Sequence, residues 1–295
     1  MSDQSMAGRT CVITGAASGM GRIAARELAK MGATVIMNDR DVKDGHAARA
    51  EIVQLSGNER VEFIACDMGE FAQVRAFAAH ILAKYPAIHV LINNAGLTDP
   101  EYHLNSAGHE QHMAIMHLGH YLLIDLLIDR LKASAPARII QISSDAHKAG
   151  PGIDFEDMRC DKLWKGARYA NFGAFQAYHR AKLAMLYATY ELTDRFSGTG
   201  VTINAISPGY FVSTNVFRHM RGITKLGVRL LRPLFSDPER AAQTYVFLAS
   251  STEVDGVSGK YWEHCKEKQT SPMSHDPAIR ERLIRYTEDA LGVSR

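Results

Sequence analysis

The sequence predicts an α/β protein built on a parallel sheet, and three observations support this class. Short β-branched and apolar runs alternate along the chain with longer segments of helical periodicity. The strand-like runs are almost continuously apolar, as a sheet covered by helices on both faces requires. With 295 residues, of which 46% are hydrophobic and 22% charged, the chain has the composition of a globular protein and can bury a large core in one domain.

The order of these segments gives the expected elements. Strands are expected at 10–14, 34–38, 61–66, 89–94, 138–143 and 201–207, and helices near 19–31, 43–56, 70–85, 109–132 and 176–196. After residue 208 the alternation stops, so 209–237 and 260–277 are expected to form loops and short helices over one end of the sheet. No linker divides the chain, which favours one domain over 1–295.

A glycine-rich loop follows the first expected strand. It reads TGAASGMG, from Thr14 to Gly21, and a helical pattern begins where it ends. A strand, a glycine turn and a helix N-terminus form an anion site, because the backbone can approach a pyrophosphate and the first N–H groups point at it. A glycine turn alone is weak evidence, but Asp39 closes the second strand 24 residues after Gly15, near the dinucleotide-binding spacing. The sequence therefore predicts a single Rossmann-type, doubly wound parallel sheet with a nucleotide site.

The spacing of the loop glycines, TGxxxGxG, resembles that of the short-chain dehydrogenase/reductase family. Further motifs agree in order along the chain: NNAG (93–96), ISS (142–144), YHRAK (178–182) and SPG (207–209). The segments at 117–123, 198–209 and 257–268 resemble the retinol-dehydrogenase branch and its bacterial relatives. The resemblance implies a nucleotide-binding core with catalytic motifs in 8–208, substrate-covering loops with the last helix and strand in 209–277, and a C-terminal helix in 278–295.

Tyr178 and Lys182 are four residues apart on an expected helix, so their side chains share a face. A free tyrosine is a poor base at neutral pH, with a pKa of about 10, and a nearby ammonium would lower that pKa. An ordinary helical Tyr/Lys pair would be the better interpretation if the motif stood alone. The resemblance implies that Tyr178 exchanges the proton, that Lys182 also holds the nicotinamide ribose, and that Ser144, rather than Ser143, orients the carbonyl. The implied reaction is hydride transfer between an alcohol and nicotinamide.

The resemblance also implies a set of cofactor-binding residues. These residues are expected to contact the pyrophosphate, the adenine, the adenosine ribose, whose 2′ position lies at the end of the second strand, and the nicotinamide. The residues are Gly15, Ser18, Gly19, Met20, Gly21, Asp39, Arg40, Asp67, Met68, Asn94, Ala95, Gly96, Tyr178, Lys182, Pro208, Gly209 and Ser213.

Asp39 and Arg40 favour different cofactors. A carboxylate accepts hydrogen bonds from a ribose 2′-hydroxyl and repels a 2′-phosphate, whereas a guanidinium attracts that phosphate. Arg40 can swing toward solvent or stack over adenine, so we expect Asp39 to determine the cofactor preference. NAD is therefore the predicted cofactor and NADP the alternative.

One position departs from the family pattern. Met116 in IMHLGHY stands where the family has an asparagine that helps to hold a water near the lysine. A thioether donates no hydrogen bond and accepts weakly. Backbone carbonyls holding the water would leave an active enzyme, which the other catalytic positions favour. The alternative is a cofactor-binding relative with impaired turnover.

Other features of the sequence bear on partners. The net charge of +2 gives no argument for nucleic acid. His109, His112, His117 and His120 have a spacing that can ligate metal, but no acidic or cysteine ligand clusters with them in the sequence, so no metal is expected. The N-terminus lacks the apolar core of a signal peptide, and no window reaches the length of a membrane span, which favours a cytoplasmic location. The resemblance implies a homo-oligomer.

The segment 215–235 is basic and amphipathic. It has five Arg/Lys and no acidic residue. In the family this region covers the substrate, so a lid with a solvated basic face is expected, and contact with an anionic membrane surface is the alternative. Its apolar residues favour a lipophilic alcohol or carbonyl substrate.

Overall fold

The structure is a computed structural model that describes residues 5–150, 152–166, 170–209 and 237–293. An eight-stranded sheet has the order β3-β2-β1-β4-β5-β6-β7-β8. Neighbouring strands are parallel, except that β8 runs antiparallel to β7. The strands are β1 (Thr10–Ile13), β2 (Thr34–Asp39), β3 (Val61–Ala65), β4 (Val90–Asn93), β5 (Ala137–Ile142), β6 (Val201–Ile206), β7 (Tyr261–Glu263) and β8 (Lys266–Glu267). The order reverses between β1 and β4, where a doubly wound sheet binds its ligand.

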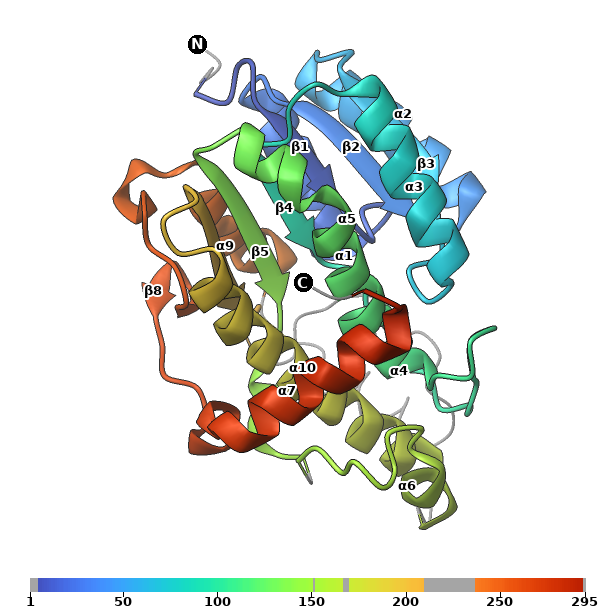
Figure 1. Ribbon diagram of the computed structural model, residues 1–295. Helices are drawn as coiled ribbons and strands as arrows, with labels where there is room; N and C mark the ends of the chain where they lie inside the picture. Colours follow the sequence, from blue (N-terminus) through green and yellow to red (C-terminus); the bar gives the residue numbers. More distant parts are fainter. Residues whose placement is uncertain (1–4, 151, 167–169, 210–236, 294–295) are drawn as a thin grey trace.

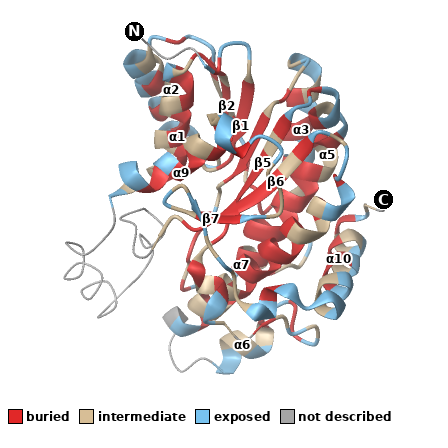
Figure 2. Cartoon of the chain, turned by 90° about the vertical axis from the view of Figure 1, so that its left-hand side faces the viewer, coloured by how far each residue is buried: buried red, intermediate tan, exposed pale blue. Residues whose placement is uncertain are grey.

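Helices cover both faces of the sheet (Figures 1 and 2). One face carries α1 (Gly19–Lys30), α2 (Val42–Ser56) and α9 (Pro238–Ser250), and the other carries α3 (Phe71–Lys84), α5 (His120–Ala133) and α7 (Ala170–Arg195), with α10 (Pro277–Leu291) against α7. Alternating strand residues supply the two cores: Cys11 and Ile13 pack in one cluster and Val12 in the other. The predicted α/β fold class is confirmed.

Short helical turns lie mainly at the end of the sheet where the strands point. They are α4 (Gln111–Met113), the π-helical η1 (Ala114–Gly119), η2 (Asp145–Lys148), α6 (Asp161–Gly166), η5 (Thr252–Val254) and η6 (Pro272–His275). The predicted continuous helix over 109–132 is therefore divided into α4, η1 and α5. The helix predicted at 176–196 begins earlier, at Ala170.

The expectation of loops and short helices at 260–277 was wrong in part, because this stretch adds two strands to the sheet, in the region 209–277 for which the resemblance implied a last strand. Tyr261 and Trp262 are buried and pair in parallel with Ala205 and Ile206 of β6. A strand this short leaves no periodic signal, and it forms through pairing with β6 and β8. Most of the other expected loop, 210–236, lies outside the described residues, as does the basic segment 215–235. No helix in the described part of the chain has the length and apolarity needed to cross a membrane.

Candidate active site

A cavity of about 750 Å³ lies at the carboxyl ends of β1, β4, β5 and β6. Nearly all the described residues that the sequence predicted for the site line it. They are Gly15, Ser18, Gly19, Met20, Asp39, Arg40, Asp67, Met68, Asn94, Ala95, Gly96, Ser144, Tyr178, Lys182, Pro208 and Gly209. Gly21 does not line the cavity but packs behind the loop, and Ser213 lies outside the described residues. The fold thus brings together one site from segments far apart in the sequence.

The glycine loop has the shape of a phosphate cradle. Gly15 adopts φ 64° and Gly19 φ 56°, which favour glycine. A Cβ on Gly15 would lie 2.7 Å from Ala95 Cα, and one on Gly21 would lie 2.6 Å from the Gly15 carbonyl oxygen. Ser18 precedes α1 and makes no side-chain capping hydrogen bond, so the first N–H groups of α1 are available to an anion. These features fit the pyrophosphate of a dinucleotide.

Asn94 and Thr14 hold this loop against the end of β4. The Asn94 side-chain amide donates to the carbonyls of Thr14 and Gly15, at 2.8 and 2.9 Å. Thr14 Oγ1 accepts from the backbone N–H groups of Asn94 and Ala95, at 2.9 and 3.0 Å. The loop and the strand end therefore form one rigid wall.

Asp39 is fixed beside the loop by two backbone groups. Its Oδ2 accepts from the Ala17 N–H at 3.3 Å, and its Oδ1 accepts from the Asp41 N–H at 3.2 Å. Arg40 also lines the cavity, but it is exposed. The structure thus holds the carboxylate in place and leaves the guanidinium in solvent.

Ser144, Tyr178 and Lys182 meet at the far end of the cavity. Ser144 follows β5, and its Oγ accepts from the Ala146 N–H at 3.1 Å. Lys182 Nζ lies 5.5 Å from the centroid of the Tyr178 ring and donates to the Ile142 carbonyl. The three side chains lie where a hydroxyl, a phenol and an ammonium can surround one substrate oxygen and a cofactor ribose.

Burial shifts the pKa values of Tyr178 and Lys182. It raises the pKa of Tyr178 to about 12, against the opposing effect of a hydrogen bond with Ser144. It lowers the pKa of Lys182 to about 7. The expectation that Lys182 lowers the pKa of Tyr178 was therefore wrong for this structure. Lys182 Nζ donates to the Ile142 carbonyl, and the pKa of Tyr178 is set by desolvation, which raises it, and by the hydrogen bond with Ser144, which lowers it less.

Met116 is fully buried in the π-helical turn η1. Its Sδ lies 3.2 Å from where a Cβ on Gly96 would be, so the thioether packs directly behind the NNAG turn. The Met116 carbonyl lies 3.2 Å from His120 Nδ1, and His120 Nε2 lies 2.9 Å from Thr14 Oγ1. Burial lowers the pKa of His120 to about 3, so this imidazole is neutral and links η1 to the glycine loop.

The other histidines of this region also have partners of their own. His109 Nδ1 lies 3.2 Å from the Tyr286 hydroxyl, and His117 Nε2 lies 2.7 Å from Thr287 Oγ1. His112 Nδ1 lies 2.5 Å from Glu110 Oε1 in the interior. In the described ranges, the structure brings no three His, Cys, Asp or Glu residues together in a way that could hold a metal ion.

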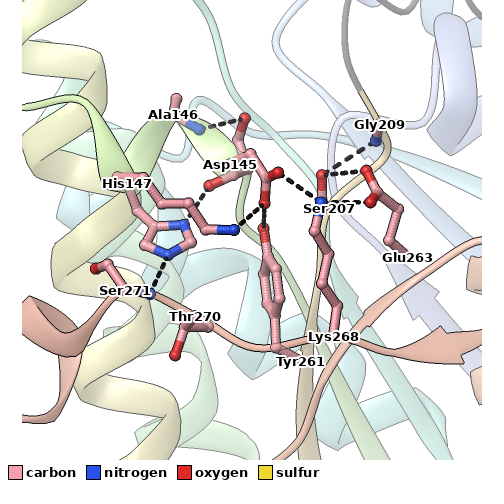
Figure 3. A network of polar contacts seen from close by, with 12 residues as sticks. Asp145, Ala146, His147, Ser207, Gly209, Tyr261, Glu263, Lys268, Thr270 and Ser271 are labelled. Carbon is pink, nitrogen blue, oxygen red and sulfur yellow. Dashed lines mark hydrogen bonds and ion pairs between the residues drawn. The ribbon is translucent and has the colours of Figure 1, made fainter.

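The cavity also has lining residues that sequence reasoning missed. Asp145 directly follows Ser144, Lys148 lies four residues after Ser144, and His179 directly follows Tyr178, so proximity to the motifs was the available signal. Figure 3 shows Asp145 in a polar network with Tyr261, which lies in β7, and Lys268, which directly follows β8. Nothing local in the sequence indicated that contact.

Fold and site together define a nucleotide-dependent oxidoreductase with a serine, a tyrosine and a lysine at one end of its cavity. Comparisons with known proteins agree. A family model described as short chain dehydrogenase matches residues 9–153. Retinol dehydrogenase 12 of Bos taurus is 40% identical over 99% of this chain and 89% of its own length. Retinol dehydrogenase 14 of Mus musculus is 37% identical over 98% of this chain and 87% of its own.

Solved structures show the same fold. An uncharacterized protein from Mycobacterium paratuberculosis superposes with a TM-score of 0.75 and 31% identity, over 98% of this chain and 95% of that one. Levodione reductase, at 20% identity, has a TM-score of 0.70 over 87% and 95% of the two chains. The chain belongs to the short-chain dehydrogenase/reductase family, in its retinol-dehydrogenase-like branch. It is an NAD(P)-dependent dehydrogenase that acts on CH–OH groups.

Proposed function

We propose that this enzyme interconverts a lipophilic alcohol and its carbonyl compound, with NAD as cofactor and Tyr178 as the proton-transferring residue. One observation carries the proposal: Ser144, Tyr178 and Lys182 line the same cavity as the glycine loop and the Pro208–Gly209 turn. A dinucleotide on the loop would extend toward that triad. Reaction chemistry and cofactor would thus meet at one end of the cavity.

Each side chain has a distinct part in the proposed reaction. The nicotinamide, when bound, gives or takes the hydride. The Ser144 hydroxyl orients the substrate oxygen, and Tyr178 donates a proton to it in carbonyl reduction or removes one in alcohol oxidation. Lys182 holds the cofactor ribose. The high pKa of Tyr178 keeps the phenol protonated near neutral pH, which favours its role as a proton donor in reduction.

A lipophilic substrate is supported by the cavity lining. Leu97, Ile115, Phe172 and Phe175 contribute apolar surface to it. The related proteins named retinol dehydrogenases agree with this chemistry. Preference for NAD is supported by the fixed carboxylate of Asp39. A cytoplasmic location and a homo-oligomeric state stay predictions from the sequence.

The alternative, a cofactor-binding protein with impaired turnover, depends on Met116 alone. The retained triad and the enzymatic relatives do not favour it.

Tyr178→Phe tests the proposed function. Purified wild type and variant are screened with lipophilic alcohols and carbonyl compounds, with each nicotinamide pair in turn, by absorbance of the reduced cofactor. We expect the variant to lose turnover by a factor of roughly 100 or more while it still binds the cofactor in calorimetry. Turnover near that of wild type would refute the role of Tyr178.

A further inference from the structure

Three polar side chains on one face of the β7–β8 hairpin, those of Tyr261, Glu263 and Lys268, form one network, and the exposed Lys266, which pairs with Glu263, lies on the same face. His264 and Cys265 form its tight turn, with φ of 51° and 58°. The Lys268 N–H donates to the Tyr261 carbonyl at 2.7 Å, so Tyr261 and Lys268 lie opposite each other. Because strand side chains alternate, Glu263 shares their face. The hairpin thus directs a phenol, a carboxylate and an ammonium toward the end of β5.

Asp145 lines the cavity and contacts this face of the hairpin. It directly follows Ser144, and its side chain is 5% exposed. Its Oδ2 lies 2.5 Å from Lys268 Nζ, and its Oδ1 accepts from the Tyr261 hydroxyl at 3.1 Å (Figure 3). Lys148 Nζ lies 3.3 Å from the same Oδ1. The turn that carries Ser144 is therefore anchored to the hairpin through one buried carboxylate.

Glu263 continues the network to the turn that follows the neighbouring strand β6. Its Oε2 forms an ion pair with Lys268 Nζ, and its Oε1 lies 3.3 Å from Ser207 Oγ (Figure 3). Ser207 Oγ also accepts from the Gly209 N–H at 3.1 Å. Ser207 thereby fixes the turn of the SPG motif, whose Pro208 and Gly209 line the cavity.

We propose that Lys268 is a positioning residue for hydride transfer. Its single ammonium joins Asp145, behind the Ser144 turn, to Glu263, behind the Ser207–Gly209 turn. The ion pairs thereby set the separation between the substrate-orienting hydroxyl and the turn that would border the nicotinamide. This inference rests on the proposed roles of Ser144 and the SPG turn.

Loss of the Lys268 ammonium would move the Ser144 turn away from the Ser207–Gly209 turn. Asp145 and Glu263, at 5% and 15% side-chain exposure, would be left as like charges with little water to screen them. Among the described residues, the other charged or titratable groups near them are Lys148, Tyr261 and His147 around Asp145, and Lys266 and His264 beside Glu263. A small misplacement of two reacting groups costs up to roughly 100-fold in rate.

Lys268→Met tests the proposal with two ligands, NAD and ADP-ribose, which lacks the nicotinamide. We expect calorimetry to show weaker binding of NAD and unchanged binding of ADP-ribose, because the glycine loop and Asp39 are distant from the hairpin. We expect kcat to fall by roughly ten- to a hundredfold. If the variant lost structure, the binding of NAD and that of ADP-ribose would instead weaken equally. The proposal is wrong if the ratio of the two affinities keeps its wild-type value, or if kcat stays within about twofold of it.

Lys260→Met is the matched control. Lys260 pairs with Glu267 at 3.0 Å on the same hairpin, and both side chains are nearly half exposed. It contacts neither turn, so kcat and both affinities should keep their wild-type values. A loss equal to that of Lys268→Met would assign the effect to hairpin stability and overturn the proposal.

A double variant provides a second test. Adding Glu263→Gln to Lys268→Met removes one of the two repelling carboxylates, so kcat should rise above that of the single variant. A further fall would contradict the proposal. Tyr178→Phe is assayed in parallel: if it keeps turnover, the proposed function fails, whereas the comparison of NAD with ADP-ribose still tests Lys268.

Discussion

The carboxylate of Asp39 accepts a hydrogen bond from the backbone N–H of Ala17 at 3.3 Å, which ties the end of β2 to the glycine loop. A second bond, from the Asp41 N–H, holds the other carboxylate oxygen. The side chain that would meet the ribose is therefore fixed before a cofactor arrives. Preorganisation of this kind strengthens discrimination, because the carboxylate cannot turn away from a phosphate without losing both bonds.

Asp39→Ser should shift the cofactor preference toward NADP. The serine removes the repulsion of a 2′-phosphate, and Arg40 can then attract that group. We expect the ratio of kcat/KM with NADP to that with NAD to rise by roughly tenfold or more. In the same background, Arg40→Ala should reverse most of the gain. A wild-type enzyme that already prefers NADP would show that Arg40 decides.

The raised pKa of Tyr178 predicts different pH profiles for the two directions. With a pKa of about 12 the phenol is protonated near neutral pH, so the proton donor for reduction is present throughout that range. Oxidation needs the phenolate, whose fraction rises about tenfold per pH unit below the pKa. Initial rates from pH 6 to 9 should therefore rise for oxidation and show no rise for reduction. Oxidation rates that are flat over this range would contradict this prediction.

Lys182→Met should trade activity for stability. The folded-state pKa of about 7 lies below the ordinary value of 10.5, so the unfolded chain binds the proton more tightly between these values. The wild-type free energy of unfolding should therefore rise with pH across this window, while the variant lacks that rise. At pH 7 the buried lysine costs the folded state up to roughly 5 kcal/mol, of which ~1–3 kcal/mol is offset by its bond to Ile142.

Urea unfolding at pH 7 and pH 10 measures this effect. The variant should be more stable than wild type at pH 7, by about 2 kcal/mol, and the difference should narrow at pH 10. Its turnover should fall strongly, because the ribose contact is lost. A variant less stable than wild type at pH 7 would show that the lysine is not a net cost to the fold.

Met116→Asn should give little gain in turnover. Lys182 Nζ already donates to the Ile142 carbonyl, and the buried methionine packs against Gly96. We expect a rate change well below the roughly 100-fold of a positioned proton-transfer group, together with lower stability because a polar amide replaces a buried thioether. Met113→Asn, at a buried position in the preceding turn, controls for the loss of stability. A large gain in rate would support the impaired-relay interpretation.

Local patterns predicted the parts of the site that are contiguous in sequence. The loop from Gly15 to Gly21 is recognisable because only glycine permits its backbone approach, and the interval of four between Tyr178 and Lys182 is one helical turn. The alternation of apolar strands and helices predicted the sheet for a similar reason. Two features have no such local pattern: the short strand β7, which pairs with β6, and the π-helical turn around Met116.

The sequence by itself determined the fold class and the glycine loop, because each is encoded by residues in local register, and its resemblance to the family led us to propose Tyr178 as the proton-transferring group. Only the tertiary structure decided how these groups titrate and what holds them. The pKa values of Tyr178 and Lys182 depend on burial by distant segments, which reversed the expected shift of the tyrosine. The meeting of Asp145 with Lys268 joins the end of β5 to a hairpin more than a hundred positions later, which the folding of the sheet alone brings about.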